Sequence, residues 1–413
     1  MALERLDEAL RQDLAALESE GRAKAPERVI VGYAPPEGKR GPRYLLRGLD
    51  RPFLRMNSNS YLSLSNHPKL VEAAHQASEA LGVGPGAVRF IDGTFAQHVA
   101  LEDRAARFVG KPSSKIFNSA YTTVLGAALA ITHKRTYWIG DELNHNCIIR
   151  SMRVANVPSE NKAIYPHNDM AALEQCLDNV PEDMERVVVV FDGIFSMRGD
   201  FAPADRIVEL AARHDDRFRD GVITVMDDSH GIGAYGATGR GTAEHTGAHP
   251  DVIVGTFGKA FGVNGGFVAS SPTVIEAVRQ KADTYIYTNP LSVGDCAAAL
   301  AAMEIADGPE GRDRLARLKG RTAQFREGLS ALGLESIPGP HPVVPLLVRD
   351  TNATRRMVGD LFEGGVLAVG LTFPVVPRGD ETIRFQINAD HTEQDIDGLL
   401  QLLWRCRRGE PLR

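Results

Sequence analysis

Three short apolar runs, each followed at once by polar residues, constrain the fold of this chain more than any other feature. They are RVVVVF (186–191), GVITVMDD (221–228) and DVIVGTF (251–257), rich in β-branched residues and without apolar–polar alternation. Such runs are typical of strands buried on both faces. Between the first two, PADRIVELAARHDD carries an apolar stripe at helical spacing. This order predicts a mostly parallel α/β sheet covered by helices, with ligands bound beyond the carboxyl ends of its strands.

The two ends of the chain have sequence patterns that differ from this central region. Leucines at helical spacing near the start (Leu3, Leu6, Leu10, Leu14 and Leu17) predict an amphipathic helix that stops at Gly21 and covers another surface, such as a partner subunit. After about residue 290, an Ala/Leu-rich helical stretch leads into VVPLLV, a second helix and TIRFQIN. We expect an N-terminal helix and arm (1–58), a large α/β domain (59–290) and a smaller α+β C-terminal domain (291–413).

Charge and composition narrow the classes of function. The net charge of −6 gives no general field for capturing nucleic acid or an anionic membrane, so neither is an expected partner. No apolar run is long enough to span a bilayer, and the start is too charged for a signal peptide. The four cysteines are scattered without metal-ligand spacing, so we expect reduced thiols, no metal site and a cytoplasmic location.

Two polar motifs follow predicted strands and suggest carbonyl chemistry. Lys259 lies among glycines in TFGKAFGVNGG, where a desolvated amine could attack an aldehyde; the alternative is a surface lysine in a turn. Asp227 and His230 lie in MDDSHG. A cofactor with a pyridine ring needs a carboxylate at the ring nitrogen, which Asp227 would supply, and His230 could reach the ring oxygen or the substrate. Alternatively, Asp227 and Asp228 merely cap the next segment.

Two further segments could hold the same cofactor. His145, in DELNHNC, could stack on a pyridine face, although a lone histidine is more often a satisfied polar residue. The segment NSAYTTVLGAALA predicts a helix start, whose backbone N–H groups bind phosphate or are simply capped. The candidates for holding a phosphate are Ser119, Ala120 and Tyr121, with the hydroxyl of Thr256.

An arginine and a glycine-rich motif complete the set. Arg384 lies within the strand-like TIRFQIN and needs an anionic partner, either a substrate carboxylate or an internal acid. GIGAYG (231–236) fits a dinucleotide-binding pattern, but the required apolar helix does not follow it, so a dehydrogenase is disfavoured. There is also no G-x-S-x-G elbow.

In order and spacing, these motifs resemble those of the α-oxoamine synthases, a branch of the fold-type I pyridoxal 5′-phosphate (PLP) enzymes. The resemblance covers the chain from about Asp7 to near the C-terminus. It rests on NSYLSLSNHP, GPGAVRFIDGTFAQHVALE, DELNHN, FDGIFSMRGD, MDDSHGIGAYGATGRG, TFGKAFG and TFPVVPRGDETIRFQINADHT. It implies a fold-type I PLP transferase with a large sheet domain, a smaller C-terminal domain, and active sites shared across a homodimer.

The resemblance also implies roles for individual residues. Lys259 would form the Schiff base, Asp227 would pair with the ring nitrogen, His145 would stack on the ring and His230 would bond its O3′ oxygen. The phosphate would be held by Ser119, Ala120, Tyr121 and Thr256, with Thr288 reaching the cofactor of the neighbouring subunit. The amino-acid substrate would be contacted by Asn59, Ser196 and Arg384, and Ser196 would also touch the cofactor.

The implied reaction joins a small amino acid, with glycine favoured, to an acyl-CoA or acyl-carrier-protein thioester, releasing the thiol. AVRFIDGT, DGIFSMRGD, DDSHG, HPVVPLLVRD and FPVVP resemble the glycine C-acetyltransferase (2-amino-3-ketobutyrate CoA ligase) branch. TFGKAFG is closer to 8-amino-7-oxononanoate synthases, and Ser63 stands where the family usually has glycine. Alternatives are an 8-amino-7-oxononanoate synthase-like or other long-acyl or specialised-metabolite member, an aminotransferase, and a non-catalytic subunit of the same fold.

Overall fold

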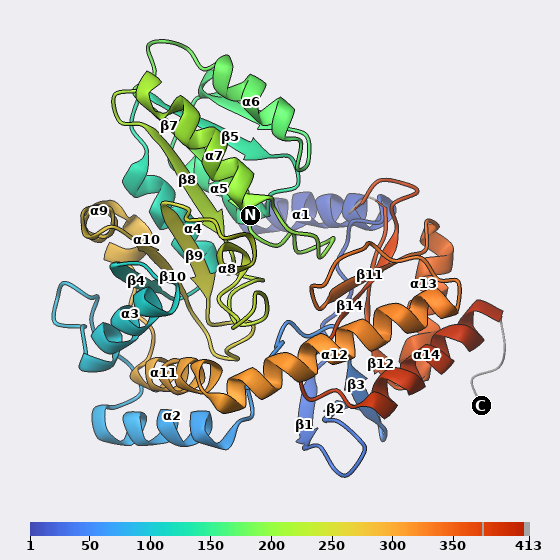
Figure 1. Cartoon of the computed structure of the whole chain (residues 1–413). Coiled ribbons are helices and arrows are strands. Elements are labelled where there is room, and N and C mark those ends of the chain that lie inside the picture. The colour runs from blue at the N-terminus through green and yellow to red at the C-terminus, as the bar shows by residue number, and fades with distance from the viewer. Residues whose placement is uncertain (374–375, 409–413) are drawn as a thin grey trace. The chain divides into compact units, whose positions relative to one another are not determined.

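The structure is a computed structural model that describes residues 1–373 and 376–408 (Figure 1). The FPVVP segment therefore lies partly outside the described residues. The chain forms two compact units. The first joins Met1–Ser58 to Lys319–Arg413, and the second is Asn59–Leu318.

The second unit is built on a seven-stranded sheet with the order β4-β10-β9-β8-β7-β5-β6. Its strands are β4 (Ser113–Phe117), β5 (Thr136–Asp141), β6 (Lys162–Tyr165), β7 (Arg186–Asp192), β8 (Val222–Asp227), β9 (Val252–Thr256) and β10 (Gly266–Ser270). Strands β5 to β9 pair in parallel, whereas β10 runs antiparallel to both of its neighbours. The three apolar runs are the adjacent strands β7, β8 and β9, so the predicted mostly parallel α/β fold is confirmed.

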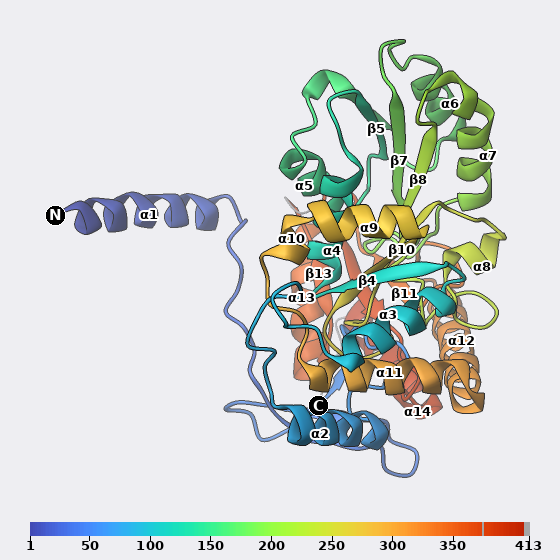
Figure 2. The same ribbon diagram turned by 90° about the vertical axis from the view of Figure 1, so that its left-hand side faces the viewer.

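Helices cover both faces of this sheet (Figures 1 and 2). On one face lie α4 (Ala120–Ile131), α5 (Asn146–Val154) and α9 (Pro272–Lys281), and on the other α6 (Met170–Asp178) and α7 (Ala204–His214). The predicted stripe of α7 is buried through Ile207, Leu210 and Ala211. Burying each of the two larger side chains contributes about 1.5–3 kcal/mol. The remaining helices are α2 (Pro68–Leu81), α3 (Ala96–Phe108), α8 (Thr242–Thr246), α10 (Asp283–Ile286), α11 (Val293–Asp307) and α12 (Pro309–Ala331).

The first unit contains two small sheets. One has the order β1-β2-β3-β12 and the other β11-β14-β13. Their strands are β1 (Ile30–Ala34), β2 (Arg43–Leu46), β3 (Pro52–Arg55), β11 (Val343–Leu347), β12 (Val366–Leu367), β13 (Val369–Leu371) and β14 (Thr382–Gln386). The helices are α1 (Ala2–Ser19), α13 (Thr351–Glu363), α14 (Glu393–Arg408) and the C-terminal part of α12.

The division into units differs from the expected domains at two places. The arm is not separate, because β3 pairs in parallel with β12 and Arg43 forms an ion pair with Asp395 at a distance of 2.5 Å. The boundary expected near 290 lies instead after Leu318. Helix α11 belongs to the second unit because it packs on α2 and α3.

Helix α1 confirms the predicted helix but ends at Ser19, shortly before Gly21, whose φ is +67°. None of its residues is buried, and Leu3 and Leu14 are 66% and 59% exposed. Within the part of the chain that the structure describes, the apolar stripe is therefore left largely uncovered, and only Leu17 is half-buried. Among the described helices, none is both long and apolar enough to cross a bilayer.

Candidate active site

Lys259 and Asp227 lie at the same edge of the seven-stranded sheet. Asp227 is the last residue of β8, and Lys259 follows the end of the adjacent parallel strand β9 by three residues. Asp227 is buried and Lys259 half-buried. Both charges act on the imidazole of His145. The predicted convergence of an amine and a carboxylate at adjacent strand ends is thus present.

The Asp227 carboxylate is fixed by two neighbours. Its Oδ1 accepts hydrogen bonds from the backbone N and the Oγ of Ser229, at 3.1 and 2.5 Å. The thiol of Cys147 donates to Oδ2 at 3.6 Å. Burial, with the nearby Asp227 and Asp192 charges, raises the pKa of Cys147 far above its ordinary value. The sulfur therefore stays protonated, as a donor to Asp227 must.

His145 is held in one orientation at the start of α5. Its Nδ1 accepts from the backbone N of Cys147 at 3.2 Å, and its own backbone N donates to Asp192 Oδ2 at 2.7 Å. Desolvation and the Lys259 charge lower the pKa of His145, although the Asp227 charge opposes them. A neutral ring with its proton on Nε2 fits these contacts. Burial, together with Asp227, raises the pKa of Asp192 well above its usual range.

His230 is joined to Asn59 through a buried phenol. The Oη of Tyr61 lies 2.7 Å from His230 Nδ1 and donates to Asn59 Oδ1 at 3.4 Å. Tyr61 is fully buried, and His230 is 7% exposed. The hydroxyl can therefore set which nitrogen of the His230 ring carries the proton.

The start of α4 lies close against the β9–β10 turn. Ser119 is the N-cap, and its Oγ accepts from Thr122 N at 3.2 Å. For the backbone N–H groups of Ala120 and Tyr121, the described part of the chain offers no acceptor. A Cβ on Gly266 would lie 2.4 Å from Ala120 N, so the two backbones meet closely. Thr256 Oγ1 donates to Gly265 O at 3.0 Å, in the same turn.

These groups fit PLP. One edge of the sheet holds a half-buried amine for the aldehyde of PLP and a fixed carboxylate for its pyridine nitrogen. The same edge holds a neutral imidazole for the face of the ring and a helix N-terminus for the phosphate. The fit comes from residues of the second unit alone.

Three further predicted residues are not among the groups described so far. Ser196 is half-buried in the loop after β7. Thr288 is exposed and donates to Thr284 O in its own chain at 2.6 Å. Arg384 lies on β14 of the first unit, where Gln386 Oε1, in the amide orientation that satisfies both groups, accepts from its Nε and Nη2 at 2.7 and 2.6 Å. The buried side-chain amide of Gln386 therefore fixes the orientation of the Arg384 guanidinium.

The dinucleotide reading of GIGAYG is wrong. The segment is followed only by α8, a helix of five residues, and winds around the buried Asp228. That carboxylate accepts from the backbone N and Oγ1 of Thr242 at 2.6 and 2.7 Å. A Cβ on Gly241 would lie 1.9 Å from Asp228 Oδ2, so the glycine makes room for a buried acid. Burial, opposed by the Thr242 bonds, raises the pKa of Asp228 to about 7.

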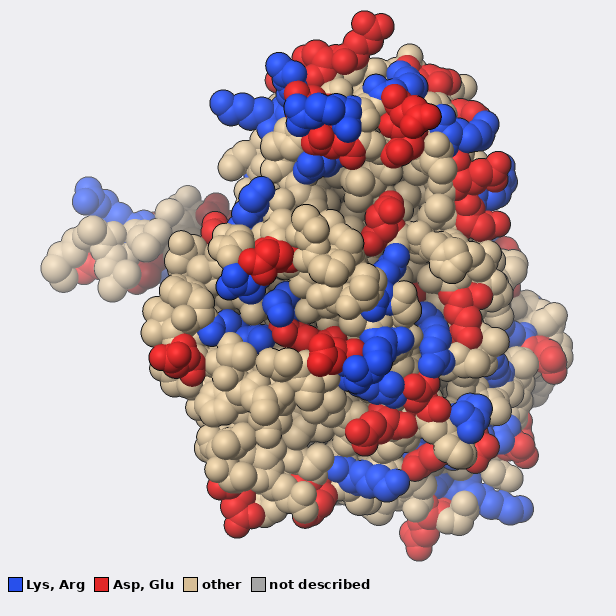
Figure 3. Space-filling view, turned by 60° about the vertical axis from the view of Figure 1, so that its left-hand side comes forward, with Lys and Arg blue, Asp and Glu red and all other residues tan. Residues whose placement is uncertain are grey.

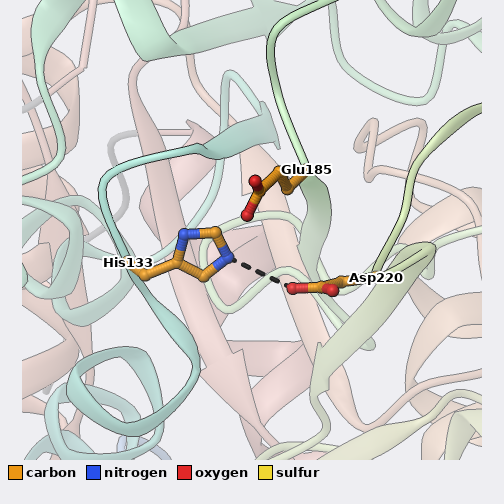
Figure 4. A group of neighbouring side chains, drawn as sticks. All are labelled: His133, Glu185 and Asp220. Carbon is orange, nitrogen blue, oxygen red and sulfur yellow. Dashed lines mark hydrogen bonds and ion pairs between the residues drawn. The ribbon is translucent and has the colours of Figure 1, made fainter.

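A second histidine–carboxylate cluster lies at the opposite, amino edge of the sheet (Figure 4). His133, Glu185 and Asp220 come from the loops before β5, β7 and β8, and their ligand atoms lie within 4.8 Å of one another. Arg135 and Arg219 bind Glu185, each at 2.7 Å, and Asp220 binds Arg186 and Arg219 at 2.8 and 3.0 Å. Three cations already neutralise both acids, which disfavours a metal ion there.

The surface charge agrees with the composition. On the face drawn in Figure 3, acidic and basic side chains are interspersed, and neither sign forms a continuous field.

Comparison with known proteins gives consistent results. A model of the family "Aminotransferase class I and II" matches residues 51–403. An 8-amino-7-oxononanoate synthase of Geobacter metallireducens is 36% identical over 409 residues, covering 98% of this chain and 99% of that protein. Another, of Thermosipho melanesiensis, is 37% identical over 350 residues, covering 84% and 86%.

A solved structure shares the fold over nearly the full length. Serine palmitoyltransferase from S. paucimobilis, with a bound PLP–myriocin aldimine, matches with a TM-score of 0.86 and 26% identity, covering 98% of each chain.

Proposed function

From its membership of the class I and II aminotransferase family, we propose that the chain is an 8-amino-7-oxononanoate synthase. Within that family it belongs to the α-oxoamine synthases, which are PLP-dependent enzymes that condense an amino acid with an acyl thioester. The observation that carries this proposal is the full-length similarity to relatives of that name. The glycine C-acetyltransferase suggested by several motifs becomes the second candidate, because the relatives favour the other branch.

The name of that product defines the substrates. In 8-amino-7-oxononanoate, the carbon that bears the amine is bonded to the ketone carbon and to a terminal methyl group. An amino acid that loses its carboxylate and contributes CH3–CH(NH2) is alanine, since glycine has no methyl group. The rest of the product is a seven-carbon acyl group ending in a carboxylate. We therefore propose alanine and a heptanedioyl (pimeloyl) thioester of CoA or a carrier protein as substrates.

The residues of the sheet edge would hold the cofactor. Lys259 would bind its aldehyde, Asp227 its ring nitrogen and His145 its ring face, while the start of α4 and Thr256 would bind its phosphate. When bound, PLP supplies the electron-withdrawing ring that stabilises negative charge on the α-carbon of the amino acid.

The chain's own groups would then move the protons. Lys259 would be the amine that takes the α-proton of the amino acid, because it is half-buried and its charge acts on the imidazole of His145. His145, neutral and with a proton on Nε2, can donate a hydrogen bond to the thioester oxygen as it becomes negative. His230, oriented by its contact with Tyr61, would lie within hydrogen-bonding reach of the ring oxygen of the cofactor.

Three residues would orient the amino acid. Arg384 is suited to a substrate carboxylate because Gln386 already fixes its planar fork. Asn59 and Ser196 would complete the contacts. We propose these roles from the family pattern together with the burial and bonding of each side chain.

We also propose that the active enzyme is a homodimer in which Thr288 serves the neighbouring site. Thr288 is exposed, and Tyr287 beside it is 73% exposed. Other large apolar side chains of the second unit are equally uncovered, including Val83 at 79% and Phe90 at 60%. Large exposed apolar patches often mark protein–protein interfaces, and aromatic residues are enriched there.

The decisive experiment measures thiol release with paired substrates. The holoenzyme is given alanine, glycine or serine with pimeloyl-CoA, acetyl-CoA or palmitoyl-CoA, and free thiol is followed with time. The proposal expects alanine with pimeloyl-CoA to give the highest kcat/KM. Faster release with glycine and acetyl-CoA would favour the second candidate, and keto-acid formation without thiol release would show an aminotransferase.

A further inference from the structure

Three side chains from neighbouring segments meet beside the carboxyl edge of the sheet. Asp141 ends β5, His167 follows β6, and Asp200 lies in the loop after β7. The Nδ1 of His167 lies 3.1 and 3.2 Å from the two oxygens of Asp141, and its Nε2 lies 3.2 Å from Asp200 Oδ2. The Asp141 side chain is inaccessible, and that of His167 is 14% exposed. The proposed chemistry uses none of these three groups.

The geometry requires a cationic ring. Each ring nitrogen faces a carboxylate oxygen, and a neutral imidazole has only one N–H to donate. Burial acts to lower the pKa of His167, but hydrogen bonds and charge from Asp141 and Asp200 dominate and raise it to about 9.

The other charged neighbours do not replace this contact. Arg198 Nε donates to the same Asp200 oxygen at 2.8 Å, and Glu142 Oε1 accepts from the backbone N of His167. The ring of Phe195 packs against the imidazole edge-on, with centroids 4.4 Å apart.

Asp200 belongs to a small loop that is closed on itself. Within residues 193–201, Phe195 N donates to Asp200 O at 3.0 Å and Gly199 N to Phe195 O at 2.8 Å. Ile194 and Phe201 form a bridge at its base. Ser196 lies inside this loop. Two side chains from the segment after β6 contact this loop. His167 contacts Asp200, and the neighbouring Asn168 donates to Phe201 O at 3.2 Å.

We propose that His167 is a positioning residue whose imidazolium clasps the 193–201 loop between Asp141 and Asp200 and thereby holds Ser196 against the bound amino acid. The second half of this inference rests on the proposed function, whereas the clasp itself does not. A charge-assisted contact at both nitrogens is stronger than a neutral hydrogen bond, so its loss should loosen the loop selectively.

The sign of the pH dependence follows from the raised pKa. A histidine whose folded pKa lies above its unfolded value stabilises the fold fully below about pH 6.5, and this stabilisation is lost as the pH rises through about 9. The clasp should therefore be closed at neutral pH and open in alkali.

The test of the clasp is hydrogen exchange of the amides in 193–201, in the full chain and corrected for intrinsic exchange. His167→Gln should raise exchange at Phe195 and Gly199 about tenfold, and the wild type should show the same rise above about pH 9. The matched control is His214→Gln, because His214 is also buried and bound to one acid, Asp178, at 3.0 Å. Asp200→Asn, which removes one carboxylate, should shift the alkaline loosening to lower pH.

The functional arm measures alanine kinetics in the same holoenzymes. His167→Gln should raise the KM for alanine about tenfold and change kcat less than about twofold at neutral pH, and the wild type should approach it in alkali. Unchanged exchange in both His167→Gln and Asp200→Asn would overturn the clasp. Loosened exchange with an unchanged KM would overturn the positioning of Ser196. A chain that never binds PLP would refute the proposed function, while the exchange result would still decide the clasp.

Discussion

The two edges of the seven-stranded sheet carry similar side chains in opposite electrostatic settings. At the amino edge, His133, Glu185 and Asp220 are surrounded by three arginines that pair with both acids. At the carboxyl edge, Asp192 and Asp228 are buried, and their pKa values are raised because of burial rather than lowered by an arginine.

The difference in electrostatic setting indicates which edge of the sheet is suited to catalysis. Acids that are neutralised by exposed arginines are stable and inert, since the pairs are screened and satisfied. Acids and imidazoles that are buried near a half-buried lysine have shifted pKa values, as in His145 and Asp192, and such shifts are typical of functional sites. The composition of a cluster alone does not distinguish the two edges.

The largest expected effect is the loss of Lys259. Lys259→Ala should reduce turnover at least about a thousandfold, because both the amine that binds the aldehyde and the proton acceptor are removed. The visible absorbance of the PLP-loaded protein should change in the same variant. Asp220→Asn, the matched change at the amino edge, should leave turnover within about twofold. Full activity in Lys259→Ala would contradict the assignment of catalysis to the carboxyl edge of the sheet.

A smaller effect is expected for Asp227. Asp227→Asn should lower kcat by about a hundredfold or more, because a neutral amide does not keep the ring nitrogen protonated. Circular dichroism and the melting temperature check that the fold persists, and Ser229→Ala separates the loss of charge from the loss of position. A kcat within threefold of the wild type, about 0.7 kcal/mol, would contradict the role of this carboxylate.

At the amino edge, stability should change instead of activity. The Arg219 hydrogen bond lowers the pKa of Asp220 to about 2, against desolvation and with help from Arg186. The stabilisation is therefore present above about pH 4 and is lost as the pH falls toward 2. Asp220→Asn should cost about 0.5–1 kcal/mol in denaturant unfolding at neutral pH, discounted for solvent screening. If Zn2+ stabilised the wild type but not this variant, the cluster would be a metal site after all.

The smallest effect concerns backbone strain at the carboxyl edge. Ser63, which stands where the family usually has glycine, adopts a φ of +55° two residues after Tyr61. Ser63→Gly should stabilise the protein by about 0.5 kcal/mol, since the left-handed conformation costs about 1–2 kcal/mol and glycine is about 0.5–1 kcal/mol more costly to order. Equal or lower stability, measured by denaturant unfolding, would show that the strain is compensated locally.

Much of the site could be predicted from strand ends. Asp227 and Lys259 each follow an apolar run, and parallel strands bring such positions to one edge. The start of α4 was visible as a Ser followed by small residues. These predictions needed only local sequence and one rule of topology.

The supporting contacts could not be predicted in the same way. Tyr61 reaches His230 across 169 positions of the chain, and Cys147 reaches Asp227 across 80. Sequence patterning shows that such residues are buried or polar, but not which partner they meet. The boundary expected at 290 failed for a similar reason, because the small residues of α11 indicate a buried helix without showing that α2 and α3 cover it.

Chemical trapping of the cofactor tests most directly whether Lys259 forms the Schiff base. The PLP-loaded protein is reduced with borohydride and digested, and the modified peptide is sequenced by mass spectrometry. We expect a phosphopyridoxyl group on Lys259 alone. A modification on another lysine, or no modification in protein that turns over substrate, would contradict it.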